Sequence, residues 1–203
     1  GKRFYWQNRE KTFTLVGLGH AYKIQNDMQQ NRFDVVEQEW LRLTKNIALE
    51  GQEVQPILFG GFTFDPKNEV TGEWAQFPQS YFTVATHQLV IRNDQAFVTI
   101  NLITSEESSA QTFEALRKER DELIHATQVK EVKTYAKPMM TSYAEPFKDE
   151  YLRSIDQVTR LIKANEAQKV VIARSLALQF EEAVYSPQIL SHVANEQPES
   201  FLF

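Results

Sequence analysis

The sequence predicts an α+β fold. Segments whose side chains alternate between apolar and polar or small are typical of strands, and they lie on both sides of segments with apolar residues at helical spacing. The order of these segments lacks the regular strand–helix–strand repeat of a doubly wound parallel sheet. The chain has 203 residues, which is enough to bury a sizeable core. We therefore expect a single domain over residues 1–203.

The first half of the chain is predicted to form strands around one helix. Turn residues at 8–10 separate two apolar runs and predict a hairpin over residues 4–16. A strand is expected over 57–64, where Gly60 and Gly61 indicate a bulge or a close backbone approach, although simple packing of sheets explains them equally well. Two further strands, 81–91 and 96–104, are joined by a turn at 92–94. Between the hairpin and the strand over 57–64, a helix is predicted over 31–49, with a buried stripe of Phe33, Val36, Trp40, Leu43 and Ile47.

The second half is predicted to be richer in helix. Apolar residues at helical spacing predict helices over 108–127 and 147–166, and the mixed region 128–146 is expected to connect two layers. The first of these helices has Phe113, Leu116, Leu123 and Ile124 as its expected buried stripe. A strand is expected to begin at Lys169, a helix to follow Ser186, and another strand to begin at 200–203.

Composition excludes several classes of function. The hydrophobic fraction of 42% and the charged fraction of 24% are ordinary for a globular protein. The net charge of −5 argues against nucleic acid as a partner, and no apolar stretch approaches the roughly 20 residues of a membrane span. The absence of cysteine excludes disulfides and thiol catalysis. Together with the absence of a targeting segment, this leads us to expect a cytoplasmic protein without a membrane partner.

Common catalytic and metal-binding motifs are absent from the sequence. There is no phosphate-binding loop, no dinucleotide fingerprint and no His-Glu-x-x-His pair. The four histidines are far apart and lack the spacing of metal ligands. We therefore expect no metal site within this chain.

The run from Lys169 to Arg174 is the one candidate for chemistry. In a strand, the odd positions 171, 173, 175 and 177 would place smaller side chains on the face that carries Lys169, leaving room for a ligand. A lysine amine can act as a general base once its surroundings lower its pKa. From the residue pattern alone, an ordinary solvated lysine at a strand start is the more frequent case.

Several segments resemble the chorismate-utilising enzymes, and specifically the isochorismate synthases. The run 168–174 resembles their Lys-Val-Val-Leu-Ala-Arg signature, and the helix that precedes it is similar to theirs. Residues 59–66, followed by Trp74 and by Phe77-Pro78, resemble the same family, as does the opening 3–6 with Gly17-Leu18-Gly19. These segments occur in the family's order over nearly the whole chain, and the menaquinone-pathway branch is the more similar one.

The resemblance implies a fold of two β-sheets packed face to face with helices outside. It implies that chorismate is the substrate, that Mg²⁺ is the cofactor, and that water adds at C2 while the C4 hydroxyl leaves. The lysine of the signature, here Lys169, would be the general base that activates the water. In the family, a glutamate of a Ser-Pro-Glu-type motif is the general acid, and the metal-holding glutamates lie further on.

No such motif follows Lys169 in this sequence. We therefore expect the chain to be the N-terminal and central part of a longer enzyme, to bind Mg²⁺ only weakly and to be inactive alone. Open sheet edges, above all at 200–203, would favour a non-native dimer.

Two other readings stay open. A salicylate synthase, a siderophore-pathway isochorismate synthase, or an ammonia-using anthranilate or aminodeoxychorismate synthase would share much of the pattern. A non-catalytic binding domain, in which Lys169 is only structural, would also satisfy the residue pattern.

Overall fold

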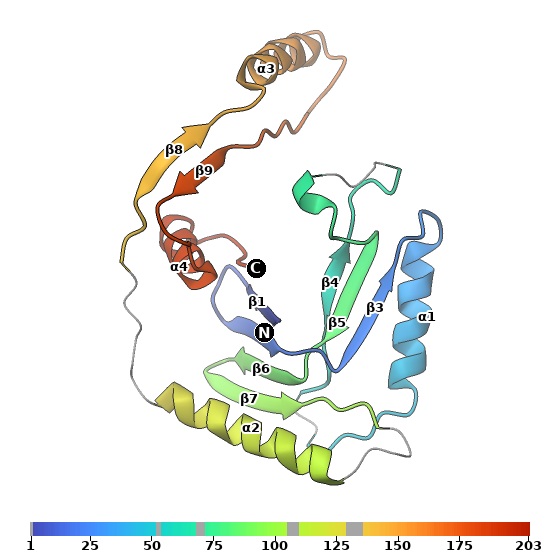
Figure 1. Ribbon diagram of the computed structural model, residues 1–203. Coiled ribbons are helices and arrows are strands. Elements are labelled where there is room, and N and C mark those ends of the chain that lie inside the picture. The colour runs from blue at the N-terminus through green and yellow to red at the C-terminus, as the bar shows by residue number, and fades with distance from the viewer. Residues whose placement is uncertain (1, 52–53, 68–71, 105–109, 129–135) are drawn as a thin grey trace. The chain divides into compact units, whose positions relative to one another are not determined.

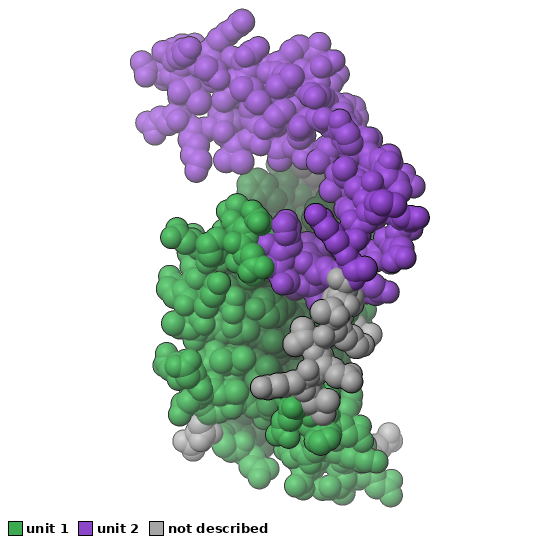
Figure 2. Space-filling view, turned by 90° about the vertical axis from the view of Figure 1, so that its left-hand side faces the viewer, with its two compact units in different colours: residues 1–131, 193–203 green, residues 132–192 purple. Residues whose placement is uncertain are grey.

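A computed structural model describes residues 2–51, 54–67, 72–104, 110–128 and 136–203, apart from the side chain of Glu73. The chain forms two compact units (Figure 2): residues 1–131 with 193–203, and residues 132–192. Helices and strictly antiparallel sheets are combined, which confirms the predicted α+β class.

The first unit contains a four-stranded antiparallel sheet in the order β1-β2-β6-β7. Its strands are β1 (Arg3–Gln7), β2 (Phe13–Leu18), β6 (His87–Arg92) and β7 (Gln95–Ile100). The pairing of β1 with β2 confirms the predicted N-terminal hairpin. At the turn between β6 and β7, Asn93 and Asp94 both have positive φ, 49° and 62°, as the tightest hairpins require.

A three-stranded sheet in the order β3-β5-β4 completes the strands of this unit. It consists of β3 (Tyr22–Asn26), which the sequence did not predict, β4 (Leu58–Phe62) and β5 (Ser80–Val84). The prediction of one strand over 81–91 is wrong, because the chain passes from one sheet to the other at Ala85 and Thr86. Asn101 makes this crossing possible: its side chain donates to Ala85 O at 2.8 Å and its backbone donates to Thr86 O at 2.8 Å.

The core of the first unit joins the two sheets. Leu15, Phe59, Ala85 and Val90 form its buried cluster, and the ring of Phe4 from β1 stacks on Phe59 from β4 at 5.5 Å between centroids. The close contact of the sheets is the reason for glycine at position 17, where a Cβ atom would lie 2.8 Å from that of Ala85.

Two helices lie against these sheets (Figure 1). Helix α1 (Arg32–Thr44) contacts β3 and buries Val36, and its Phe33 ring lies 4.4 Å from that of Phe62. The predicted helix over 31–49 is therefore too long. Its predicted buried stripe is wrong at Phe33, which is 59% exposed, and at Ile47, which lies exposed beyond the end of the helix.

Helix α2 (Ala110–Gln128) contacts β7, and the ring of His87 lies 3.2 Å from Leu116 O. The predicted buried stripe of α2 is wrong, because none of its residues is buried. A short 3-10 turn, η1 (Gly72–Trp74), lies between β4 and β5 along the chain.

The second unit contains helix α3 (Lys148–Lys163) and a two-stranded sheet of β8 (Met140–Ala144) and β9 (Ala177–Phe180). Helix α4 (Ser186–Glu196) begins in this unit and confirms the helix predicted to follow Ser186. The prediction of a strand beginning at Lys169 is wrong: β9 begins eight residues later. A strand needs a hydrogen-bonding neighbour, and β8, the neighbour found among the described residues, pairs only with Ala177–Phe180.

The C-terminal residues are attached to the first unit. Leu202 is 6% exposed and exchanges two backbone hydrogen bonds with Gln7, of 2.9 and 3.1 Å. The expectation of an open strand over 200–203 is therefore wrong at Leu202, whose backbone already has a partner on β1. Within the described ranges, no helix is long and apolar enough to cross a membrane.

Candidate functional site

Lys169 lies in the second unit, in a segment without regular structure between α3 and β9. Its side chain is exposed, and it has no hydrogen bond or ion pair with any residue that the structure describes. The face of small side chains predicted beside Lys169 is not formed, because the alternation of a strand is missing there. Val170 and Val171 would lie on opposite faces of a strand, yet both are exposed, at 44% and 81%.

The end of α3 determines where this segment begins. Asn165 has a positive φ of 60°. The backbone N–H of Glu166 donates to Leu161 O at 2.9 Å, and this hydrogen bond closes a loop of six residues. This is the geometry of a Schellman motif, in which a residue with left-handed backbone ends the helix and satisfies a free carbonyl. Asparagine is among the few residues that adopt this conformation readily. The helix therefore ends a few residues before Lys169.

The other end of the segment is held by Arg174. Its Nη1 donates to Glu145 Oε2 at 2.6 Å, and its guanidinium carbon lies 5.3 Å from the centre of the Tyr151 ring on α3. Glu145 also accepts a hydrogen bond from Lys148 Nζ at 3.3 Å. The hydrogen bond from Arg174, followed by the contribution of Lys148, lowers the pKa of the Glu145 carboxyl group. Lys169 is thus carried on a short segment whose two ends are fixed and whose middle is exposed.

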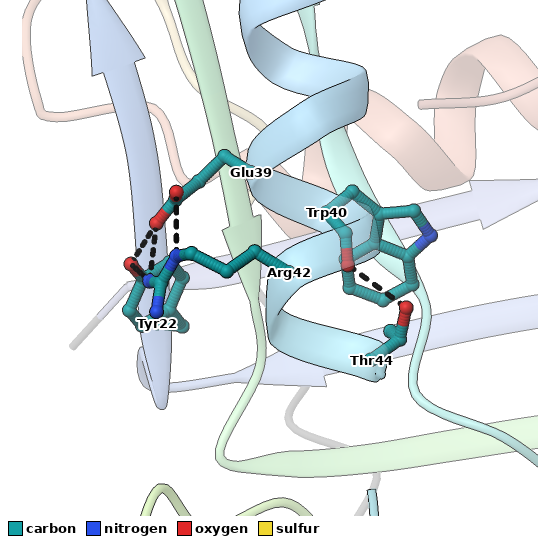
Figure 3. A network of polar contacts seen from close by, with 5 residues as sticks. All are labelled: Tyr22, Glu39, Trp40, Arg42 and Thr44. Atoms are coloured by element: carbon teal, nitrogen blue, oxygen red, sulfur yellow. Dashed lines mark hydrogen bonds and ion pairs between the residues drawn. The ribbon is translucent and has the colours of Figure 1, made fainter. Parts of the chain in front are cut away.

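A second polar cluster joins α1 to β3 in the first unit (Figure 3). Arg42 donates to Glu39 Oε1 at 2.7 Å and to the Tyr22 hydroxyl at 2.9 Å, and that hydroxyl also donates to Glu39. The hydrogen bond from Arg42, and then that from Tyr22, lower the pKa of Glu39 to about 2. Glu39 and Arg42 border an open hollow of about 440 Å³. Because Glu39 and Arg42 on α1 both bond to the Tyr22 hydroxyl on β3, the cluster holds the helix on the sheet.

Arg32 is a buried cation that the sequence did not reveal. It is 7% exposed, and its Nη1 donates to the backbone oxygen of Thr63 at 2.7 Å and to the hydroxyl of Thr63 at 2.8 Å. Its guanidinium carbon also lies 5.6 Å from the centre of the Phe62 ring. An arginine at a helix start normally faces water, so no sequence signal marks it. Arg32 fixes the end of β4 to the start of α1.

A magnesium site is not formed by the residues that the structure describes. No group of three or more histidine, aspartate or glutamate side chains among them lies close enough together to hold a metal ion. Hard cations such as Mg²⁺ need several oxygen ligands around one point. We therefore assign no chemical step of this chain to a metal.

Comparison with protein families decides the relationship. The model of the family described as "Chorismate binding enzyme" matches residues 1–203. The chain belongs to this family. The resemblance found in the sequence is therefore confirmed at the level of the chorismate-binding enzymes.

Two relatives of known name extend the comparison. The chain is 30% identical over 212 aligned residues to the isochorismate synthase MenF of Bacillus subtilis, and the alignment covers 100% of this chain and 44% of that protein. Its fold is similar to that of the menaquinone-specific isochorismate synthase MenF of Escherichia coli, with a TM-score of 0.61 and 20% identity, over 98% of this chain and 40% of that one. The chain thus spans less than half the length of each of these two relatives.

Proposed function

We propose that the whole protein containing this chain is an isochorismate synthase that supplies menaquinone biosynthesis. The observation that carries the proposal is the family match over residues 1–203 together with 30% identity to a named isochorismate synthase. The reaction converts chorismate to isochorismate: water adds at C2, the ring double bonds shift, and the C4 hydroxyl leaves as water. The two compact units would then be parts of one domain, and the expected location is the cytoplasm.

Lys169 would act as the general base of this reaction. Its neutral amine would take a proton from the attacking water as the oxygen forms its bond to C2. The ordinary pKa of a lysine amine is about 10.4. This role therefore requires surroundings that favour the neutral amine, chiefly burial or a nearby positive charge. The exposed position of Lys169 in this chain implies that such surroundings come from polypeptide outside the described residues.

The whole enzyme would also depend on Mg²⁺, held by residues other than those described here. Removal of the ion with a chelator should abolish turnover, and added Mg²⁺ should restore it. Activity that is unchanged by thorough chelation would exclude this dependence.

Lys169→Ala in the whole protein tests the proposed base. General bases typically contribute about 10²- to 10⁴-fold to a rate, so turnover of chorismate should fall by roughly that factor while circular dichroism stays the same. Added small primary amines should restore part of the rate, which a purely structural lysine would not allow. Near-normal turnover of this variant would overturn the assignment.

Two controls complete the experiment. Lys163→Ala changes an exposed lysine at the end of α3 and should leave turnover within about twofold, as expected for surface positions. The product is identified by chromatography, because salicylate in place of isochorismate would indicate a salicylate synthase.

The 203-residue chain alone should form no isochorismate, and product formed by it would contradict that expectation.

A further inference from the structure

The backbone groups of β1 point alternately to the two sides of the strand. Lys2 O accepts from Gly19 N at 3.0 Å and Asn8 N donates to Phe13 O at 3.0 Å, so the even-numbered residues face β2. Gln7 instead directs its N–H and C=O outward, to Leu202. Because antiparallel ladders alternate in this way, the backbone groups of Arg3 and Tyr5 also point outward.

Most of this outward edge is free in the part of the chain that the structure describes. The sheet begins with β1, and its neighbour in the strand order is β2. The contact found on the outer side is the single bridge between Gln7 and Leu202, which leaves the outward groups of Arg3 and Tyr5 without a strand beside them. Unpaired edge groups of this kind are a template for another strand.

The bridge at Leu202 already starts such a strand. Leu202 both donates to and accepts from Gln7, which is the hydrogen-bonded pair of an antiparallel ladder. Side chains support this start: the Phe201 ring lies 5.5 Å from that of Trp6, and the Arg9 guanidinium lies 4.9 Å from the centre of the Phe201 ring. The chain end also lies beside β1 in Figure 1. Direction and register of a further strand are thus determined.

We propose that the outer edge of β1 is a docking site for the polypeptide that continues from Phe203 in the whole protein, added as an antiparallel strand. Counting from the Gln7–Leu202 pair, the first residue after Phe203 lies opposite Tyr5 and the third lies opposite Arg3. This occupant follows from the strand already begun at Leu202, and the Bacillus subtilis relative is long enough to hold such a segment because the chain spans 44% of it.

The side-chain pattern of the added strand also follows. Its first and third residues share the side of Leu202, which is buried, whereas its second residue shares the side of Phe203, which is 87% exposed. An apolar residue is therefore expected at the first position and a polar one is tolerated at the second. This proposal concerns the sheet alone and does not depend on the reaction.

Short tails added to the 203-residue chain test the edge. One variant carries Val-Thr-Val-Thr after Phe203, and a matched variant carries Pro-Thr-Pro-Thr, whose prolines lack the N–H that Tyr5 O must accept. Amide hydrogen exchange should slow at Tyr5 by at least about tenfold with the first tail, because the amide becomes part of a ladder. Exchange at Phe4 and Trp6, which already face β2, should stay the same.

The proline tail should behave like the chain without a tail. Equal exchange at Tyr5 in all three proteins would overturn the proposal. Protection of Tyr5 that appears without a tail and grows with protein concentration would also overturn it, because it would assign the edge to a second copy of the chain.

Discussion

Arg174 donates a hydrogen bond of 2.6 Å to Glu145, and this contact ties the end of the segment carrying Lys169 to the residues just before α3. The same guanidinium lies over the Tyr151 ring, so Arg174 is held both by the charge of Glu145 and by a cation–π contact with Tyr151. Arg174 is therefore the residue that holds this segment in place, whereas the side chain of Lys169 is exposed.

Arg174→Ala should loosen this segment. We expect faster cleavage by a non-specific protease within residues 169–176, by roughly threefold to tenfold, because the contact to Glu145 no longer holds the segment. Limited proteolysis analysed by mass spectrometry reports on this region directly. As a control, Arg153→Ala removes a solvent-exposed pair with Glu150 on α3 and should leave the segment unchanged. Equal effects of the two variants would show that Arg174 is not the anchor.

Gly60→Ala should strongly destabilise the first unit. A Cβ atom at Gly60 would lie 2.1 Å from Tyr81 O and 2.6 Å from the Cα atom of Phe82, so β4 and β5 would have to separate. We expect a loss of more than about 2 kcal/mol in the free energy of unfolding, measured with urea. Gly61→Ala is the matched control, because nothing lies within 4 Å of its added Cβ atom, and it should change stability by less than about 1 kcal/mol.

Leu202→Ala should cost stability although it lies next to the end of the chain. Burial of Leu202 against β1 predicts a loss of about 2–4 kcal/mol in urea unfolding. Its neighbour Phe203 is exposed, and Phe203→Ala should change the same quantity by less than about 0.5 kcal/mol. If both variants unfold like the parent chain, the Gln7–Leu202 bridge does not contribute to the stability of the sheet.

His20 should make stability depend on pH in the weakly acidic range. Burial, and then the charges of Lys23 and Lys2, lower its pKa below the ordinary value of 6.5. The unfolded chain therefore binds this proton more readily, so stability is highest above pH 6.5 and falls as the pH drops from 6.5 towards the lower pKa of the folded state.

The contribution of His20 is separated by mutation. His20→Gln should reduce the slope of unfolding free energy against pH in this window, a slope that for one group cannot exceed about 1.4 kcal/mol per pH unit. His125→Gln, at an exposed position on α2, provides the comparison. An unchanged slope in His20→Gln would exclude His20 as its origin.

Local patterns allowed much of the secondary structure to be predicted. The N-terminal hairpin and the positions of α1, α3 and α4 depend on residues that are close together in the sequence. The two strands missed entirely, β3 and β8, pair with strands far along the chain, β5 and β9, so no hairpin turn indicates them in the sequence.

Pairing was the main source of error. The run after Lys169 alternates like a strand, but a strand exists only where another backbone accepts its hydrogen bonds, and within the described residues only 177–180 find one. For the same reason, the stretch 81–91 became two strands of different sheets. The alternation of side chains says which faces a strand would have, and not which neighbour it finds.

The sequence by itself determined the α+β class, the family and the lysine that is the candidate for chemistry, because these depend on residue types and their order. Only the tertiary structure decided that Arg32 is buried against Thr63, that Arg174 is held by Glu145, and that Leu202 starts a strand on the edge of β1. Each of these contacts joins residues at least 29 positions apart, and such contacts depend on how the sheets and helices pack rather than on any local pattern.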